Sequence, residues 1–419
     1  MGQTLFTLGL CSDFNMYPDF LRQGSTLRGD QDELDALVRG HGCFTNDLVV
    51  PAQCFAAFVR SPLAHARVLS IQTQEALKQP GVRGIYTGAD LARDGLGGIG
   101  PVVVFNGRDG QPMKQAPIPV LAHERVLHVG EAVAMVVAES RHIAEDAAAL
   151  VEIDYEPLPQ IVDPQLAMDP QAPLVHPDHG TNVIFDRTFD WGPVDHDLAA
   201  CDHQLSYSVR WSRNATVPIE TFAVSAQWND CTGILDVWAS IQMPKFPDQL
   251  AKALRLPGNA VRVHFDVDVG GSYGVKRGLK HSVLVGHLAK KLGRPVRLIE
   301  DRLENMRGGD MQGPDRRFDV TLGFNADGKI QTMRMHAVDD IGAYSGRSPL
   351  QLGKPVGAIV GPYKIKSVQY RATAVMTHKT PQEAVRGFGQ APTNYAIETG
   401  VDKVARFLGL ERDEIRRRN

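Results

Sequence analysis

The sequence has 419 residues, of which 43% are hydrophobic and 22% are charged. This length exceeds a single compact core and favours two or three domains, while the apolar content excludes a disordered polymer. The 45 basic and 48 acidic residues give a formal net charge of −3, which argues against a nucleic-acid binder because such proteins usually carry a basic face.

Residues 1–36 show no clear hydrophobic period, and we expect them to form an N-terminal extension. From residue 37 to residue 160, β-branched runs alternate with helical patterns, which predicts an α+β fold rather than a regular doubly wound sheet. The predicted strands cover residues 55–59, 81–86, 132–137 and 152–155, and the predicted helices cover residues 71–79 and 143–151.

A proline-rich stretch follows, and we expect it to form a surface linker over residues 161–181, because proline interrupts helices and central strands. A second domain is expected over residues 182–419. Its predicted strands cover residues 205–211, 223–228, 233–239, 261–269 and the hairpin 321–335, and its predicted helices cover residues 248–256, 279–292 and 393–408.

The five cysteines are widely spaced and form no C-x-x-C pair, so the chain itself is not expected to bind zinc or an iron–sulfur cluster. No apolar run reaches the roughly 18 residues of a membrane span, and the first ten residues lack the basic start of a secretory signal. We therefore expect a soluble, cytoplasmic protein with no membrane span. The histidines at 176, 179, 196 and 203 lack metal-site spacing and are interpreted as structural or solvated, so no metal ligand is predicted.

Three glycine-rich segments are candidates for ligand binding. The segment Gly95–Gly100 matches the dinucleotide-binding pattern G-x-G-x-x-G. A dinucleotide-binding loop follows a strand, whereas here the expected strand, Val102–Phe105, comes after the segment. This order favours a flexible surface loop. The segment Gly270–Lys276 lies between a predicted strand and a predicted helix, where it is either a ligand loop or a tight turn. The segment Arg386–Gln390 also leads into a helix, and two such loops favour a shared phosphate- or oxo-bearing cofactor.

Several separated motifs, taken together and in order, are specific to one family although none is specific alone. They are Phe58–Arg67, Val129–Ala134, Val151–Pro159, Ser240–Gln242, Gly270–Gly274, Glu300–Arg302, Gly342–Tyr344, Arg386–Gly389 and Ile415–Asn419. On these residues the chain resembles the molybdenum-cofactor subunit of the xanthine dehydrogenase and aldehyde oxidase family. The resemblance implies an α/β hammerhead domain over residues 37–160 and the first half of a molybdopterin-binding domain over residues 182–419.

The resemblance also implies a molybdenum–molybdopterin cofactor, with the cytosine dinucleotide form as one option. Gln242 matches the glutamine that hydrogen-bonds the apical oxygen on molybdenum. The other implied cofactor-binding residues are Gly271, Ser272, Tyr273 and Gly274 in the first loop and Arg386, Gly387 and Phe388 in the second. Phe388, Lys354 and Arg277 are assigned to substrate binding.

Two loop positions depart from the family pattern Gly-Gly-Gly-Phe-Gly, because Ser272 and Tyr273 stand in it. Arg277 stands where purine-oxidising members have an acidic substrate-binding residue, so xanthine is not the expected substrate. From the residue alone, Arg277 either faces an anionic substrate or lies at the surface.

The match ends at Asn419, whereas a complete family subunit continues. The resemblance therefore implies a split arrangement, as in nicotinate dehydrogenase, in which a second molybdopterin-binding subunit supplies the catalytic glutamate, and no catalytic residue is assigned here. 2Fe-2S and FAD subunits would carry electrons away from the hydroxylation of an electron-poor carbon, in an N-heteroaromatic ring or an aldehyde, with water-derived oxygen. Two alternatives remain: a non-catalytic scaffold or assembly subunit, and a piece of a longer chain.

Overall fold

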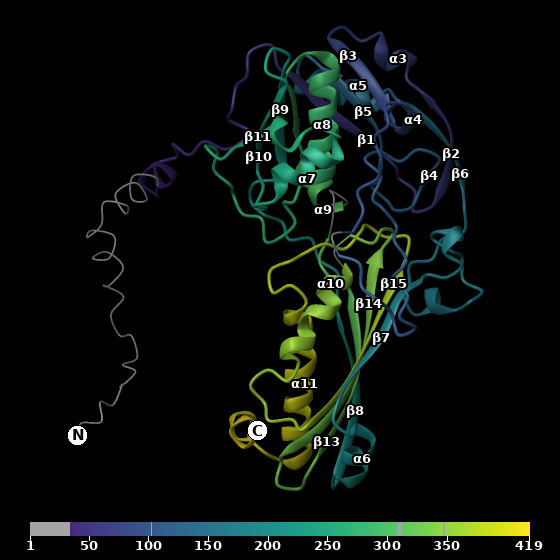
Figure 1. Ribbon diagram of the computed structural model, residues 1–419, viewed down its shortest axis with the longest axis vertical. Helices are drawn as coiled ribbons and strands as arrows, with labels where there is room; N and C mark the ends of the chain where they lie inside the picture. The colour runs from purple at the N-terminus through teal and green to yellow at the C-terminus, as the bar shows by residue number, and fades with distance from the viewer. Residues whose placement is uncertain (1–33, 102, 308–311, 347) are drawn as a thin grey trace.

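The computed structural model describes residues 34–419 except 102, 308–311 and 347. It has an upper lobe, built on a seven-stranded and a three-stranded sheet, and an elongated lower lobe, built on a five-stranded sheet (Figure 1). Helices and sheets are mixed in both lobes, so the predicted α+β class is confirmed. The expected extension over residues 1–36 lies almost entirely outside the described residues.

The seven-stranded sheet joins segments that are far apart in the sequence. Its order is β11-β10-β9-β12-β1-β5-β3. The strands are β1 (Cys54–Arg60), β3 (Val82–Thr87), β5 (Ala132–Ala138), β9 (Ala223–Asn229), β10 (Ile234–Ala239), β11 (Val261–His264) and β12 (Val296–Ile299). Because β1 pairs with β12 in parallel, strands from both sides of the expected linker share this sheet. The domain division at residues 161–181 stays a prediction.

Helices cover both faces of this sheet. Helix α8 (Leu279–Leu292) and helix α7 (Phe246–Ala253) pack on one face, and helix α5 (Arg141–Ala149) packs on the other. Strand β5 shows the arrangement, because Met135 and Val137 join the core beneath α8 while Val136 joins the core beneath α5. Burial on both faces explains its uninterrupted apolar sequence. Helix α8 ends at Gly293 in the left-handed conformation, as the sequence predicts.

The three-stranded sheet corrects part of the sequence interpretation. Its strands are β4 (Arg125–Val126), β2 (Ala66–Gln72) and β6 (Glu152–Pro157), and the short helices α3 (Gln74–Leu77) and α4 (Gly88–Arg93) lie nearby. The helix expected over residues 71–79 is mostly wrong, because Ile71 pairs with Ile153 in the sheet and only residues 74–77 are helical. The strand expected over Val102–Phe105 is absent from its described residues, 103–105, and the strand expected over 261–269 ends at His264.

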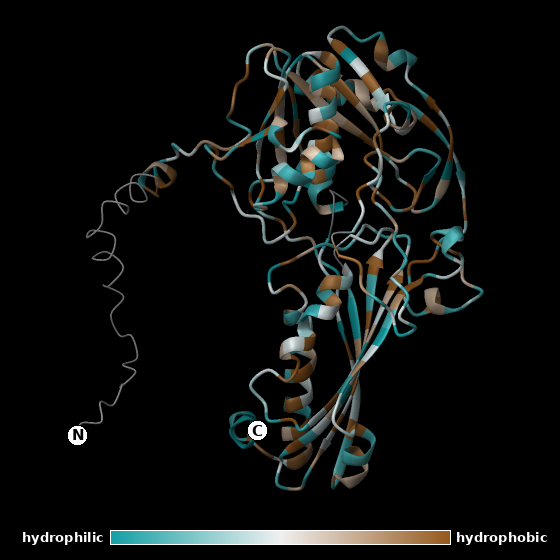
Figure 2. Ribbon diagram, in the orientation of Figure 1, coloured by the Kyte–Doolittle hydropathy of each residue, from teal (hydrophilic) through white to brown (hydrophobic). Residues whose placement is uncertain are grey.

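The lower lobe is a long twisted sheet in the order β7-β15-β14-β13-β8. The strands are β7 (Val183–Trp191), β8 (His203–Trp211), β13 (Arg316–Phe324), β14 (Ile330–Gly342) and β15 (Ser367–Met376). The predicted hairpin is confirmed, with Gly328 at positive φ in its turn. Hydrophobic and hydrophilic residues alternate along these strands (Figure 2), as expected for a sheet with one face against the helix α11 (Gln390–Leu408).

Residues 34–38 are helical, and the remaining helices that follow them are short. They are α6 (Val194–Ala200), α9 (Arg302–Arg307), α10 (Ser348–Gly353), α12 (Arg412–Arg418) and the 3₁₀ helices η1 (Leu166–Met168), η2 (Pro177–His179), η3 (Gly258–Ala260) and η4 (Lys354–Ala358). No helix in the described part of the chain has both the length and the apolar character needed to cross a membrane.

A fully buried ion pair connects the lower sheet to the segment that precedes α11. Arg316 on β13 donates to Asp339 on β14 over 2.8 Å, and both side chains have no exposed surface. Asp339 also accepts a hydrogen bond from Gln382, and Arg316 donates to the carbonyl of Gly389 over 3.4 Å. A buried charge without its partner is costly, so this pair fixes the segment on the sheet.

Replacing Arg316 by Met leaves Asp339 buried without its counter-ion. We expect this variant to lose about 3–5 kcal/mol of unfolding free energy in a denaturant titration. The double variant Arg316→Met/Asp339→Asn removes both charges and should be clearly more stable than the single variant. Equal stability of wild type and Arg316→Met would contradict the structural role of the pair.

Two stacked histidines join the lobes where the proline-rich stretch begins. The rings of His65 and His378 lie 4.1 Å apart between centroids. His65 contacts the carbonyl of Pro159 through Nδ1, and His378 accepts a hydrogen bond from the backbone of Ile161. Burial and then the neighbouring His65 lower the pKa of His378 to about 3.

This lowered pKa predicts a pH dependence of stability. The unfolded chain binds a proton at His378 below about pH 6.5, while the folded chain does not until about pH 3, so the unfolding free energy falls as the pH drops through this window. Between these pH values, His378 lowers the unfolding free energy by about 1.4 kcal/mol for each pH unit of acidification. His378→Phe should flatten the curve between pH 6.5 and 4, and the exposed control His142→Gln should leave it unchanged. An unchanged slope in His378→Phe would contradict the assignment.

Candidate functional site

The two predicted cofactor loops contact each other directly. The first, residues 270–276, lies between β11 and α8, and the second, residues 386–389, leads into α11. The backbone N–H of Arg386 donates to the carbonyl of Tyr273 over 2.7 Å. Gly274 has φ +114°, and a Cβ atom there would lie 2.2 Å from the carbonyl oxygen of Ala384. Only glycine therefore allows the loops to come this close.

Ser272, one of the two departures from the family pattern, organises the first loop. Its buried hydroxyl accepts hydrogen bonds from the backbone N–H groups of Lys276 over 3.1 Å and Gly274 over 3.4 Å. Glu220, which is not part of the loop, binds both of its ends. One of its carboxylate oxygens accepts hydrogen bonds from the backbone N–H of Gly270 and from the ammonium of Lys276. Burial lowers the pKa of Lys276, and the hydrogen bond to Glu220 opposes that shift.

Gln242 lies beside this loop, after the end of β10. Its backbone N–H donates to the carbonyl of Lys276 over 3.3 Å, and its side chain is exposed. Arg386 is exposed on the second loop. In the part of the chain that the structure describes, neither the Gln242 amide nor the Arg386 guanidinium makes a hydrogen bond or ion pair.

Several backbone donors of the loops are also unused. Among the described residues, the N–H groups of Ser272, Tyr273 and Gly387 have no hydrogen-bond acceptor. Together with the Gln242 amide and the Arg386 guanidinium, they form a set of donors around two touching loops. Such a set fits an oxygen-rich, anionic group, as a molybdenum–pterin cofactor is.

Two residues assigned to substrate binding are also brought together. The ammonium of Lys354 lies 5.0 Å from the centre of the Phe388 ring. Phe388 has φ +36°, a conformation that residues other than glycine seldom adopt. The aromatic ring and the cation thus present one composite surface beside the second loop.

Arg277 is neither at the surface nor an isolated cation, so the surface alternative is wrong. Its side chain is buried and forms an ion pair with Glu383 over 2.6 Å, and its Nε lies 3.3 Å from the sulfur of Met243. Glu383 and Glu220 were not anticipated from sequence. Neither belongs to a recognisable motif, and each finds its partner across more than 50 residues of chain.

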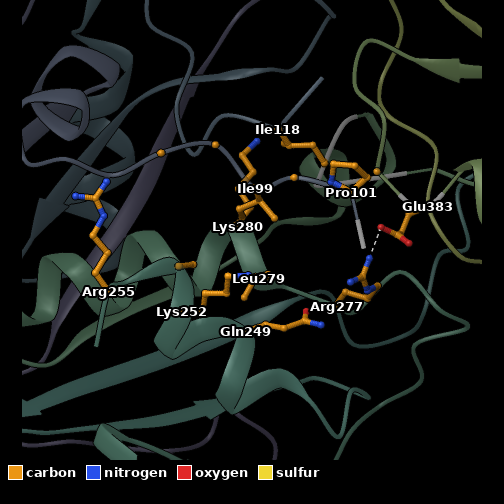
Figure 3. A pocket seen from close by; sticks show the side chains of 15 residues that line it. Ile99, Pro101, Ile118, Gln249, Lys252, Arg255, Arg277, Leu279, Lys280 and Glu383 are labelled. Carbon is orange, nitrogen blue, oxygen red and sulfur yellow. Dashed lines mark hydrogen bonds and ion pairs between the residues drawn. The ribbon is translucent and has the colours of Figure 1, made fainter. Parts of the chain in front are cut away.

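A cavity of about 460 Å³ adjoins Arg277 and Glu383 (Figure 3). Residues 97–101 form one wall, so the glycine segment interpreted as a flexible surface loop lines a cavity. Ile99 holds this wall through two backbone hydrogen bonds with Ile118. The described residues contain no group of three or more His, Cys, Asp or Glu side chains placed to hold a metal ion.

The close loop contact makes Gly274 a sensitive position. We expect Gly274→Ala to lose about 3 kcal/mol of unfolding free energy, because the methyl group collides with Ala384 and the backbone conformation is strained. Gly271→Ala is the matched control. It also has positive φ, but its nearest contact would be 3.5 Å, so we expect a loss of about 1 kcal/mol. Equal losses in thermal unfolding would contradict the tight docking of the loops.

Comparison with known proteins agrees with this arrangement. Residues 175–419 match the molybdopterin cofactor-binding domain, and residues 39–159 match the α/β hammerhead domain of aldehyde oxidase and xanthine dehydrogenase. The chain is similar to the gamma subunit of the 6-hydroxypseudooxynicotine dehydrogenase complex of Paenarthrobacter nicotinovorans, with 33% identity over 91% of this chain and 48% of the relative. It is also similar to the nicotinate dehydrogenase large molybdopterin subunit of Eubacterium barkeri, with 27% identity over 90% of this chain and 85% of the relative.

Among solved structures, quinoline 2-oxidoreductase from Pseudomonas putida 86 superimposes with a TM-score of 0.83 and 35% identity, over 92% of this chain and 49% of the other. The chain spans about half the length of most of these relatives. With both domain matches in the expected order, the chain belongs to the xanthine dehydrogenase and aldehyde oxidase family of molybdenum hydroxylases, of which it carries the hammerhead and molybdopterin-binding domains.

Proposed function

We propose that this chain is the molybdopterin-binding subunit of a hydroxylase that oxidises an electron-poor carbon, in an N-heteroaromatic ring or an aldehyde, with water-derived oxygen. The observation that carries the proposal is the direct contact of the two loops, with their backbone donors, Gln242 and Arg386 left available. When bound, the cofactor supplies the redox chemistry, and the protein supplies binding, orientation and electrostatics.

The chain's own residues have distinct tasks in this proposal. The N–H groups of Ser272, Tyr273 and Gly387 would hold oxygens of the cofactor, and Arg386 would add a positive charge beside them. The Gln242 amide would donate a further hydrogen bond to the cofactor. The Phe388 ring, with Lys354 at its side, supports a flat substrate by aromatic contact.

The general base is proposed to come from elsewhere. The two carboxylates that contact the cations following the first loop glycines are already in ion pairs, Glu220 with Lys276 and Glu383 with Arg277. We infer that a second molybdopterin-binding half supplies the glutamate. The chain covers 48% of the 6-hydroxypseudooxynicotine dehydrogenase subunit, which supports this inference, as does its similarity to the large molybdopterin subunit of nicotinate dehydrogenase.

An exposed apolar surface around the first loop fits this second half. Ile219 is 93% exposed, and Arg302 fixes its segment by donating to the carbonyls of Pro218 and Ile219. The other exposed apolar side chains of the neighbouring segments are Val217, Val269, Tyr273, Leu303 and Met306. Large apolar side chains gathered next to a binding loop are typical of a surface that another domain or subunit covers. We further propose 2Fe-2S and FAD subunits as the electron acceptors, since the 6-hydroxypseudooxynicotine dehydrogenase relative is named as a subunit of a complex.

The first test is to co-express the chain with its partner subunits and to assay the purified complex. We expect molybdenum, pterin, iron and flavin to co-purify, with dye reduction in the presence of N-heteroaromatic substrates. Gln242→Ala should keep its molybdenum content and lose about 100-fold in kcat, because one donor to the reacting centre is removed. The exposed control Gln111→Ala should keep full activity. A stable complex without molybdenum would contradict the proposal and favour a non-catalytic scaffold.

A further inference from the structure

We propose that the cavity beside the cofactor loops selects an anionic substrate and holds its carboxylate at the Lys252–Arg255 end. This inference rests on the proposed function and adds the charge class of the substrate. At about 460 Å³ the cavity has the size of pockets that bind small ring compounds. Ile99, Pro101 and Ile118 give the cavity an apolar wall between its two charged ends.

The charged residues that line the cavity are predominantly basic. Among the residues that the structure describes, they comprise one carboxylate, Glu383, and four cations, Lys252, Arg255, Arg277 and Lys280. The Arg277–Glu383 ion pair removes one charge of each sign. Lys252 and Arg255 are exposed at the cavity and have no ion pair among the residues described, so their charges are available to a ligand.

The backbone conformation of Arg255 also supports an anion-binding role for this residue. Arg255 has φ +55° just after the C-terminus of α7, where its N–H donates to Lys252 and the N–H of Leu256 donates to Ala251. Glycine usually occupies this position of a helix end, since other residues are strained there. An arginine is held in this conformation with its side chain on the cavity wall.

The start of α8 adds positive potential to the same cavity. Leu279 and Lys280, the first two residues of this 14-residue helix, line it. The N-cap residue, Gly278, has no capping side chain, and the first turn contains no acidic residue. No acidic residue of the helix's own first turn therefore offsets the partial positive charge of its N-terminus, which adds to the effect of Lys252 and Arg255.

The two ends of the cavity differ in their charged residues. In Figure 3, Arg255 lies at one end and Arg277 with Glu383 at the other, and Arg277 belongs to the segment that follows the first cofactor loop. A carboxylate held by Lys252 and Arg255 leaves the rest of the molecule extending toward that loop. The basic end thus orients the substrate, while the loops hold the cofactor.

An anion in this cavity could be a substrate carboxylate or a phosphate of the cofactor, and we propose the carboxylate.

The test uses the complex purified with its partner subunits and two probes of equal size, nicotinate and nicotinamide, which differ in charge. Calorimetry should show tighter binding of nicotinate. In Lys252→Gln/Arg255→Gln its Kd should rise about tenfold at low salt, with less effect at high salt, because screening weakens exposed charges.

The matched control is Lys78→Gln/Lys364→Gln, which removes two exposed charges away from the cavity and should leave both Kd values unchanged. Nicotinamide binding and molybdenum and pterin content should be unchanged in the cavity variant. Equal affinity for the two probes would overturn the inference. Loss of pterin with unchanged nicotinate binding would also overturn it and assign the anion to the cofactor.

The two proposals fail separately. A molybdenum-containing complex that does not distinguish nicotinate from nicotinamide overturns the anion pocket only. A complex without molybdenum that still binds nicotinate more tightly, through Lys252 and Arg255, supports the anion pocket and overturns the proposed hydroxylase.

Discussion

The contact between the two glycine loops is the constraint on which the rest of the site depends. One loop follows the seven-stranded sheet and the other precedes α11 on the lower sheet, so the contact also joins the lobes. It consists of the hydrogen bond from Arg386 to Tyr273 and the close approach at Gly274. The buried Arg316–Asp339 ion pair helps to fix the second loop, because Arg316 also donates a hydrogen bond to the carbonyl of Gly389.

The charged groups around the loops are partly paired and partly available, which agrees with the proposed division between cofactor binding and catalysis. Two nearby carboxylates, Glu220 and Glu383, form ion pairs with Lys276 and Arg277 and so stabilise the loops themselves. The donors that are left are backbone N–H groups, the Gln242 amide and the Arg386 guanidinium. This composition suits a chain that orients a cofactor and receives its proton acceptor from a second half.

Local features were predictable from sequence, and long-range pairings were not. The loops at Gly270 and Arg386, the helix ending at Gly293 and the hairpin turning at Gly328 follow from glycine chemistry and hydrophobic period over a few residues. The pairing of β1 with β12 and the pairing of Ile71 with Ile153 depend on tertiary contacts, so the sheet order and the true extent of β2 were missed. Arg277 needed the structure for a related reason: its partner, Glu383, is 106 positions away and belongs to no motif. The assignment of Gln242, the loops and Phe388 came from the family resemblance, and the structure adds that they are neighbours.

The most direct measurement is diffraction from crystals of the assembled complex, collected at the molybdenum absorption edge. We expect the anomalous peak that is strong above the edge and weak below it to lie beside residues 271–274 and 386–388, next to the Gln242 side chain, with pterin density contacting the loop N–H groups. A molybdenum peak remote from both loops, or loops separated from each other in a molybdenum-containing complex, would contradict the assignment of this site.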